Sequence, residues 1–288
     1  MGGHKMKFTK MHGCGNDYIF INCIQERVKN PEKLSRILSD RHYGIGADGL
    51  VLINDSFVAD YSMRMYNPDG TVAEMCCNAI RCIGKYVYET KMTSKTTITI
   101  ETLSGVKTLF LTVYQERVIE VMVDMGTPVF DVEKIPVISE KKEVIEEECF
   151  VLDKSFAITC VSVGNPHAVV FVNHIGAFPV ARYGLVLEHN LKFPNRINVE
   201  FVQVIDRNNI RMRIWERGTG ETLACGTGTA ASVIAGIRTG RLDNDVVVQC
   251  KGGRLKVHYD EKDNVLHLSG PAKKVFDGEV ELSEFDGN

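Results

Sequence analysis

The sequence has 288 residues, of which 44% are hydrophobic and 25% are charged, and its formal net charge is −3. These values are typical of a globular protein with enough length for one large domain or two medium ones. A chain without a basic stripe or an array of stacking aromatic residues lacks the usual features of a nucleic-acid-binding protein. We therefore expect no nucleic-acid partner.

The sequence also contains no apolar run that approaches the roughly 20 residues of a membrane-spanning helix, and its first residues lack the apolar core of a signal peptide. We expect a cytoplasmic protein with no membrane partner. Nine cysteines in such a chain indicate reduced thiols. No Cys-x-x-Cys pair and no Cys/His spacing typical of zinc occurs, so we expect no metal site.

Segments rich in β-branched and aromatic residues, bounded by turn-forming residues, are predicted to be strands along the whole chain. Helical patterns are few by comparison, which favours a sheet-dominated α+β fold. The expected strands are residues 6–11, 18–23, 49–53, 61–66, 96–102, 109–114, 117–125, 155–163, 168–172, 199–205, 210–215, 246–250, 254–258, 265–269 and 275–282.

Three segments place apolar residues at helical spacing. They start at Pro31, Asn78 and Gly226, and they end near Ser39, Glu89 and Gly240. The second has strands before and after it, so we expect a central helix wrapped by a sheet. Residues 139–148, SEKKEVIEEE, are a run of charges that we expect to form a solvated loop or a short helix face.

The stretch ERGTGETLACGTGTAA, residues 216–231, places Cys225 directly before the third helix. The first turn of a helix has unpaired N–H groups and about half a positive charge, so it favours a thiolate beside it and an anion in front of it. We therefore expect Cys225 to ionise below the value of about 8.5 of a free cysteine. A glycine-rich turn with a buried cysteine is the alternative interpretation of this stretch.

A second copy of this arrangement occurs in the first half, where NPDGTVAEMCCNAIR places Cys76 before the second helix. The spacing from the cysteine to a later glycine is 105 − 76 = 29 residues in one copy and 253 − 225 = 28 residues in the other. Two copies this similar indicate a duplicated unit. We predict two pseudo-symmetric domains whose helix-borne thiols face each other across a cleft.

The expected N-terminal domain consists of residues 1–126 and 271–288, and the expected C-terminal domain consists of residues 127–270. The last segment is assigned to the first domain because Gly270-Pro271 ends the second copy. Other polar residues allow two interpretations at this point. Turn chemistry alone accounts for Asn16 and Asn67, and His167 fits a structural role as well as a catalytic one.

Six segments taken together resemble the diaminopimelate epimerase family of cofactor-independent amino acid racemases. They cover nearly the whole chain: MHGCGNDYIFIN, RHYGIGADGLVLI, NPDGTVAEMCCNAIRC, VGNPHAVVFV, RINVEF and ERGTGETLACGTGTAA. The resemblance implies an isomerase that inverts the α-carbon of L,L-diaminopimelate to give the meso form, which is used for lysine and for peptidoglycan. It also implies that no pyridoxal phosphate or other cofactor takes part.

The family pattern assigns roles to particular residues of this chain. Cys76 and Cys225 correspond to the two acid/base residues on opposite faces of the α-carbon, and His167 and Glu216 correspond to residues near the reacting amine. Backbone N–H groups at the two helix starts would hold the reacting carboxylate; they belong to Cys77, Asn78, Gly226 and Thr227. The remaining binding positions match Asn16, Asn67, Asn165, Asn198 and Arg217, with Arg217 on the distal carboxylate.

Two residues depart from the family pattern. Cys77 stands where the family usually has glycine, and its side chain would crowd the carboxylate or offer a competing thiol. Gly49 stands where some members carry a polar residue.

The alternatives to this reading are a racemase of another amino acid, a thiol-disulfide or peroxide-reducing protein, and a non-catalytic binding module. Arg217 and the asparagines favour a small-molecule substrate with a second amino acid end. A homodimer is the expected assembly.

Overall fold

The computed structural model describes residues 5–281, so residues 1–4 and 282–288, including Leu282 of the last expected strand, lie outside it. The described chain divides into two compact units. Unit 1 consists of residues 5–123 and 271–281, and unit 2 consists of residues 124–270. Residues 124–126, the last three of strand β8 (Arg117–Gly126), are therefore grouped with unit 2, whereas the expected boundary followed residue 126. Within residues 5–281, no helix combines the length and the apolar character needed to cross a membrane.

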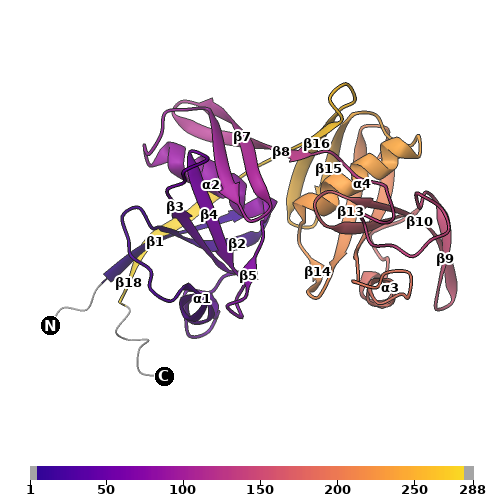
Figure 1. Ribbon diagram of the computed structural model, residues 1–288, viewed down its shortest axis with the longest axis horizontal. Coiled ribbons are helices and arrows are strands. Elements are labelled where there is room, and N and C mark those ends of the chain that lie inside the picture. The colour runs from indigo at the N-terminus through magenta and orange to yellow at the C-terminus, as the bar shows by residue number, and fades with distance from the viewer. Residues whose placement is uncertain (1–4, 282–288) are drawn as a thin grey trace. The chain divides into compact units, whose positions relative to one another are not determined.

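Unit 1 is built on a mostly antiparallel sheet with the strand order β18-β1-β2-β3-β4-β6-β7-β8 and a short strand, β5, beside β4 (Figure 1). Only the pairs β2–β3 and β4–β6 are parallel. The strands are β1 (Lys5–Gly13), β2 (Asn16–Asn22), β3 (Leu50–Asn54), β4 (Tyr61–Tyr66), β5 (Val72–Ala73), β6 (Thr97–Thr102), β7 (Gly105–Tyr114), β8 (Arg117–Gly126) and β18 (Lys273–Glu281).

Unit 2 repeats this plan with the strand order β9-β10-β11-β12-β13-β15-β16-β17 and the short β14 beside β13. Its parallel pairs, β11–β12 and β13–β15, occupy the same places in the order. The strands are β9 (Glu147–Val151), β10 (Lys154–Ser162), β11 (Pro166–Phe171), β12 (Asn198–Asp206), β13 (Asn209–Glu216), β14 (Gly220–Thr222), β15 (Asp245–Cys250), β16 (Gly253–Asp260) and β17 (Val265–Gly270). The predicted duplication and α+β class are confirmed.

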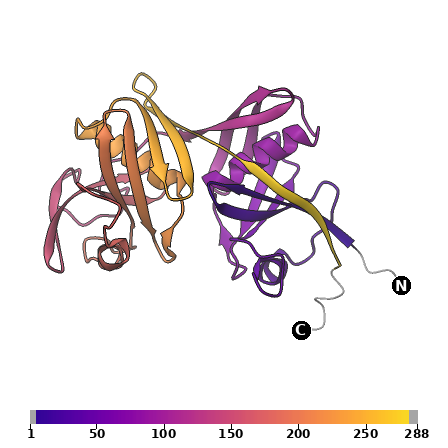
Figure 2. The same ribbon diagram turned by 180° about the vertical axis from the view of Figure 1, so that it is seen from behind.

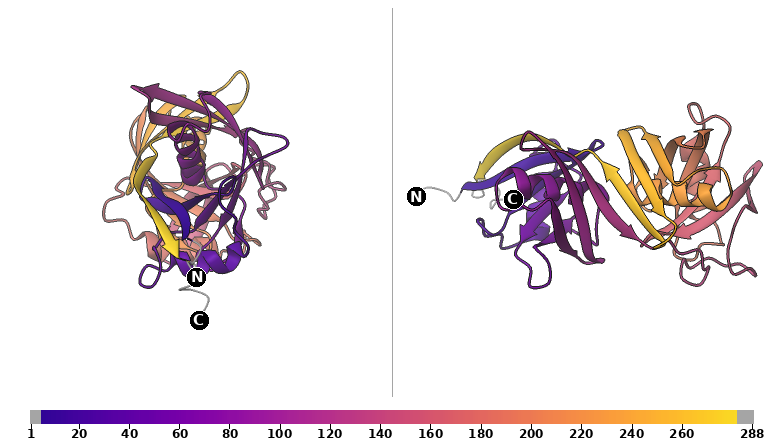
Figure 3. Two further views of the ribbon diagram at one scale, coloured as in Figure 1. Left: turned by 90° about the vertical axis from the view of Figure 1, so that its left-hand side faces the viewer. Right: turned by 90° about the horizontal axis from the view of Figure 1, so that it is seen from above.

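Each unit has one long helix, α2 (Cys77–Glu89) in unit 1 and α4 (Gly226–Arg238) in unit 2. The left view of Figure 3 shows α2 surrounded by the strands of its unit, as predicted. Nearly every residue of α4 up to Gly236 is buried. Small residues on several sides of α4 let the strands approach closely. The buried surface of this helix is therefore wider than a single apolar stripe.

The shorter helices are α1 (Pro31–Ser39) and α3 (Val180–Glu188). Each lies in the connection between two parallel strands, α1 between β2 and β3 and α3 between β11 and β12. Helix α1 has the predicted bounds. Helix α3 was not predicted, although Tyr183 and Leu187 are buried four residues apart, as on one face of a helix.

The C-terminal strand β18 pairs with β1, from Lys5 opposite Glu281 to His12 opposite Lys273 (Figure 2). The chain therefore returns to unit 1, as the sequence predicted. Arg81 of α2 is fully buried beneath this return, and its Nε lies 3.5 Å from the carbonyl oxygen of Pro271.

The charged run at residues 139–148 differs from the expectation. Val144 within it is fully buried, and the run ends inside β9, where Cys149 and Val151 face the core. Lys192 pairs with Glu147 at 2.5 Å at the start of this strand. Residues 139–146 lie outside the strands, as expected of a loop, but the last two charges of the run, Glu147 and Glu148, open a strand whose apolar face follows at Cys149 and Val151.

Gly228 lies in the first turn of α4 and provides a test of this packing. A Cβ at this position would lie 2.6 Å from Glu200 Oε1 and 2.6 Å from Ile214 Cδ1. We expect Gly228→Ala to lower the free energy of unfolding of unit 2 by about 1–2 kcal/mol, because overpacking outweighs the helix propensity of alanine. Urea unfolding followed by fluorescence of Trp215, the sole tryptophan, measures it. Gly176→Ala is the control, since its Cβ meets nothing within 4 Å. Equal stability of the two variants would contradict the close packing.

Candidate active site

Cys76 is the N-cap residue of α2, with extended backbone angles of φ −132° and ψ 123°. An N-cap residue lies next to the N–H groups of the first turn, which have no partner within the helix. Asn78 in this turn is buried, and its Oδ1 accepts a hydrogen bond from Arg81 Nη2 at 2.7 Å. Arg81 also donates to the carbonyl oxygen of Cys77 at 2.9 Å. A buried cation thus braces the turn that carries the thiol.

The thiol of Cys76 lies beside two side chains from β2. Its Sγ is 3.4 Å from the hydroxyl of Tyr18 and 3.3 Å from Asn16 Oδ1. Asn78 Nδ2 donates to the same Asn16 oxygen at 3.2 Å. The structure therefore brings the predicted residues Asn16, Cys76 and Asn78 together, and it adds Tyr18, which sequence reasoning missed.

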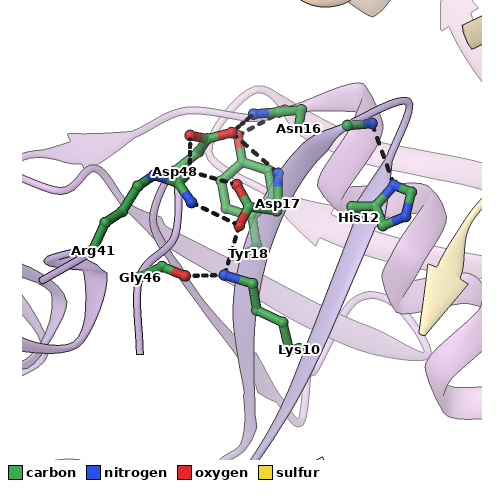
Figure 4. Close-up of polar contacts among 9 residues, drawn as sticks. Lys10, His12, Asn16, Asp17, Tyr18, Arg41, Gly46 and Asp48 are labelled. Atoms are coloured by element: carbon green, nitrogen blue, oxygen red, sulfur yellow. Dashed lines mark hydrogen bonds and ion pairs between the residues drawn. The ribbon is translucent and has the colours of Figure 1, made fainter. Parts of the chain in front are cut away.

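Asn16 is held in turn by a set of charged residues (Figure 4). Its Nδ2 donates to Asp48 Oδ2 at 2.7 Å, and Arg41 donates to Asp48 Oδ1 at 2.8 Å. Arg41 and Lys10 also pair with Asp17 at 2.7 and 2.6 Å. Burial opposes the charge of Asp17, but the hydrogen bonds from Arg41 and Lys10 outweigh it and lower the pKa of Asp17 to about 2.

Cys225 occupies the same position in unit 2. It is the N-cap residue of α4, with φ −125° and ψ 125°, and its side chain accepts from the backbone N–H of Gly228 at 3.5 Å. The hydroxyl of Thr227 lies 3.3 Å from the same sulfur. Both predicted cysteines thus stand at the start of the central helix of their own unit, in the same backbone conformation.

The ionisation of Cys225 corrects one expectation. Burial raises the pKa of the Cys225 thiol well above its usual value, and the charge of Glu216 raises it further. The hydrogen bonds from Thr227 and Gly228 lower this pKa, but by less. The expectation of a lowered pKa considered only the helix start and omitted the loss of water around the sulfur.

His167 on β11 is fully buried and has a partner at each ring nitrogen. Nδ1 lies 2.7 Å from Glu200 Oε1, and Nε2 lies 2.8 Å from Asn165 Oδ1. Burial raises the pKa of Glu200, while His167 opposes the increase. Glu200 was not identified from the sequence, because it lies 33 residues from His167 in the middle of an ordinary strand pattern.

Asn198 and Arg217 meet through the backbone. Asn198 Oδ1 accepts from the N–H of Arg217 at 2.9 Å, and its Nδ2 donates to the carbonyl oxygen of Pro166 at 2.8 Å. The guanidinium of Arg217 is exposed and donates to the carbonyl oxygen of Asn195 at 3.1 Å. Asn198 therefore joins the ends of three segments, and Arg217 keeps further donors for an anion.

Glu216 is the last residue of β13, and Asn67 directly follows β4, the equivalent strand of unit 1. Asn67 Nδ2 donates to Thr71 Oγ1 at 3.0 Å within the predicted turn, so turn chemistry does act at this position. The hydroxyl of Thr222 donates to Glu216 Oε1 in a short hydrogen bond. The structure shows Asn67 in this turn, and its assignment to the substrate site remains a prediction.

Cys77, the departure from the family pattern, is the first residue of α2 and is only 4% exposed. Its sulfur lies 3.8 Å from Met75 Sδ. Burial raises the pKa of Cys77 to about 12, with the charge of Cys76 adding to the effect. The Cys77 side chain is therefore a neutral, buried thiol, which argues against a competing nucleophile at this position.

A constant offset relates the site residues of the two units. Cys225 and Cys76 are 225 − 76 = 149 positions apart, and Glu216 and Asn67 are 216 − 67 = 149 positions apart. The same offset relates Gly226 and Thr227 to Cys77 and Asn78, and Asn165 to Asn16. Among residues 5–281 no group of three or more His, Cys, Asp or Glu side chains is placed to hold a metal ion.

Solved structures share this fold. The chain aligns with the crystal structure of a hydroxyproline epimerase from Agrobacterium vitis with a TM-score of 0.74, over 98% of this chain and 93% of the other. The two sequences are 14% identical, so the likeness defines the fold class alone.

The family is given by sequence. The family model for diaminopimelate epimerase matches residues 8–130 and 159–275. Curated diaminopimelate epimerases of Methanococcus maripaludis (strain C6) and Acetivibrio thermocellus are 51% and 52% identical to this chain, over 277 and 279 residues. These matches cover 96% and 97% of this chain and 100% of each relative. The chain belongs to the diaminopimelate epimerase family.

The charge of Glu216 provides a test of the Cys225 environment. We expect Glu216→Gln to lower the pKa of Cys225, because it removes a negative charge that opposes the thiolate. The midpoint of the pH dependence of Cys225 alkylation, followed by peptide mass spectrometry, then moves to lower pH by up to about 1 unit.

Glu221→Gln is the matched control for this measurement. Glu221 lies on the neighbouring strand β14 and pairs with Arg213 and Lys251, both at 2.7 Å. An unchanged midpoint in Glu216→Gln, or an equal shift in both variants, would contradict the assignment of the charge effect to Glu216.

Proposed function

We propose that this protein is a diaminopimelate epimerase, an isomerase that interconverts L,L-diaminopimelate and meso-diaminopimelate in lysine and peptidoglycan precursor biosynthesis. The observation that carries the proposal is the cysteine at the N-cap of each central helix, in a chain that belongs to this family. A cytoplasmic location and a homodimer, both expected from the sequence, are part of the same proposal.

The chemistry explains why two cysteines are needed. An α-hydrogen beside a carboxylate is a very weak acid, and inversion requires removal of one proton and delivery of another to the opposite face. In the proposed reaction one of Cys76 and Cys225 is the thiolate base and the other is the thiol acid, and their roles exchange in the reverse direction. The raised pKa of Cys225 suits the acid role in the resting enzyme.

The helix starts supply stabilisation without a cofactor. In the proposed complex, backbone N–H groups of Cys77, Asn78, Gly226 and Thr227 bind the reacting carboxylate as negative charge develops on it. Each such donor contributes on the order of 3 kcal/mol when aimed at the developing charge. Only the backbone of Cys77 takes part in this role, so a cysteine in place of glycine is compatible with it.

The remaining site residues are proposed to select the substrate. Glu216 and His167, whose ring nitrogens pair with Glu200 and Asn165, lie near the reacting amine in the proposed complex. Arg217 binds the carboxylate of the distal centre with its remaining donors. The distal amino acid end is further held by amides that can donate and accept, those of Asn67, Asn165 and Asn198, and Asn16 is a further binding position beside Cys76. A substrate with two amino acid ends fits this set better than an amino acid with one centre.

Proton NMR in deuterated water tests the function. We expect the reduced enzyme to incorporate deuterium at the α-carbon of L,L-diaminopimelate while the meso form accumulates, because the acid thiol exchanges with solvent. Proline and histidine under the same conditions should show no exchange. Exchange in either of these amino acids and none in diaminopimelate would contradict the substrate assignment. Thiol consumption by peroxide without any α-carbon exchange would contradict the epimerase.

Substitution of the cysteines tests the two-base assignment. We expect Cys76→Ala and Cys225→Ala each to lower kcat by about 10²–10⁴-fold or more, the usual contribution of a positioned acid or base. Cys77→Ala is the matched control, because it removes a buried thiol next to Cys76 and keeps the backbone N–H. Substantial epimerisation by Cys76→Ala or Cys225→Ala would contradict the assignment.

A further inference from the structure

Tyr18 places a hydroxyl group at the proposed base of unit 1. The side chain is 4% exposed, and its hydroxyl lies 3.4 Å from Cys76 Sγ and 3.0 Å from Asn16 Oδ1. Cys76 Sγ itself lies 3.3 Å from Asn16 Oδ1. The three atoms form a triangle in which every side is within hydrogen-bonding distance, allowing for the larger radius of sulfur.

The charged neighbours of Asn16 show which of its two side-chain amide atoms is the acceptor in this triangle. Asp48 only accepts hydrogen bonds at its carboxylate, so the Asn16 atom that faces it at 2.7 Å is the amide nitrogen. Asn16 Oδ1 therefore faces Tyr18 and Cys76. Arg81 fixes Asn78 in the same way, because the guanidinium only donates and so faces Asn78 Oδ1. Asn78 Nδ2 then donates to Asn16 Oδ1.

The two partners of Cys76 match its two protonation states. A thiol has a hydrogen to donate, and Asn16 Oδ1 accepts it. A thiolate only accepts, and among the three atoms the Tyr18 hydroxyl is the one that donates to it in a charge-assisted hydrogen bond. Burial raises the pKa of Tyr18 well above its usual value, and the charge of Cys76 adds to the effect, so the phenol keeps its proton.

We propose that Tyr18 is a positioning residue that stabilises and orients the thiolate form of Cys76, while Asn16 Oδ1 does so for the thiol form. The inference rests on the proposed function, since a two-base epimerase takes Cys76 through both forms in every turnover. The Tyr18 proton stays on the phenol throughout, and only its hydrogen-bond acceptor changes.

The repeat supports this role independently. Tyr18 and His167 are related by the same offset as the cysteines, 167 − 18 = 149, and so are Asn16 and Asn165. Each of these side chains forms a hydrogen bond with Oδ1 of the asparagine two residues before it. The distance is 3.0 Å from the Tyr18 hydroxyl and 2.8 Å from His167 Nε2. The duplicated frame thus places a hydrogen-bonding ring at the same point of each unit, a phenol in unit 1 and an imidazole in unit 2.

Alkylation of Cys76 tests the proposal without relying on turnover. Tyr18→Phe removes only the hydroxyl, and we expect the midpoint of the pH dependence of Cys76 alkylation to rise by about 1 pH unit, with a tenfold lower rate below the midpoint. Tandem mass spectrometry distinguishes Cys76 from Cys77. Tyr61→Phe is the matched control, because this tyrosine of unit 1 donates its hydroxyl to the carbonyl oxygen of Met92 at 3.0 Å.

A second variant makes the test independent of the loss of a buried hydroxyl. Difluorotyrosine at position 18 is a stronger donor than tyrosine, so the Cys76 midpoint should move to lower pH. A midpoint in Tyr18→Phe that coincides with that of the unsubstituted protein, or a shift to higher pH with difluorotyrosine, would overturn the proposal. So would a loss of epimerisation in Tyr18→Phe with an unchanged alkylation profile.

The proposed function fails on a different result. If Cys76→Ala retains epimerisation, the two-base assignment is wrong whatever the alkylation profile of Tyr18→Phe. If Cys76→Ala is inactive and the Tyr18→Phe profile is unchanged, the epimerase stands and the role of Tyr18 is wrong.

Discussion

The first turn of each central helix is the constraint on which the rest of the structure depends. A buried helix start has several N–H groups that require acceptors, and in both units the residue at that point is a cysteine. In unit 2 the sulfur itself accepts from the backbone N–H of Gly228. In unit 1 the start of β2 brings Asn16 and Tyr18 into contact with the cysteine at the start of the helix. Fold and site are therefore parts of one arrangement.

The duplicated backbone carries two chemically different environments. In unit 1 the side chains next to Cys76 are a neutral amide and a phenol, and the charges of Arg41 and Asp48 lie one contact further away. In unit 2 two carboxylates, Glu216 and Glu200, act on Cys225 directly and oppose its ionisation. The same helix geometry therefore surrounds the two thiols with different charges. Such a difference suits a reaction that needs an acid and a base at once.

Local patterns predicted much of this structure. The start of α2 was expected at Asn78 and lies at Cys77, and α1 has its predicted bounds, because capping and apolar spacing are encoded within a few residues. The contact between Tyr18 and Cys76 joins residues 58 positions apart, and nothing in either local sequence indicates it. Burial is equally non-local, which is why the acidity of Cys225 was predicted with the wrong sign and Val144 was placed in a solvated loop.

Because strand β18 of unit 1 is translated after unit 2, the two units are completed at different times during synthesis. Unit 2 is one continuous segment whose edge strand, β9, directly precedes its neighbour β10. All of its strands are therefore translated one after another, with no part of unit 1 between them. In unit 1 the equivalent edge beside β1 is filled by residues 273–281, which are translated after all of unit 2. Until then β1 has an unpaired edge that is open to other strands. Co-translational folding of this protein therefore completes its second half first, and a nascent or C-terminally truncated chain exposes the edge of the unit that carries Cys76.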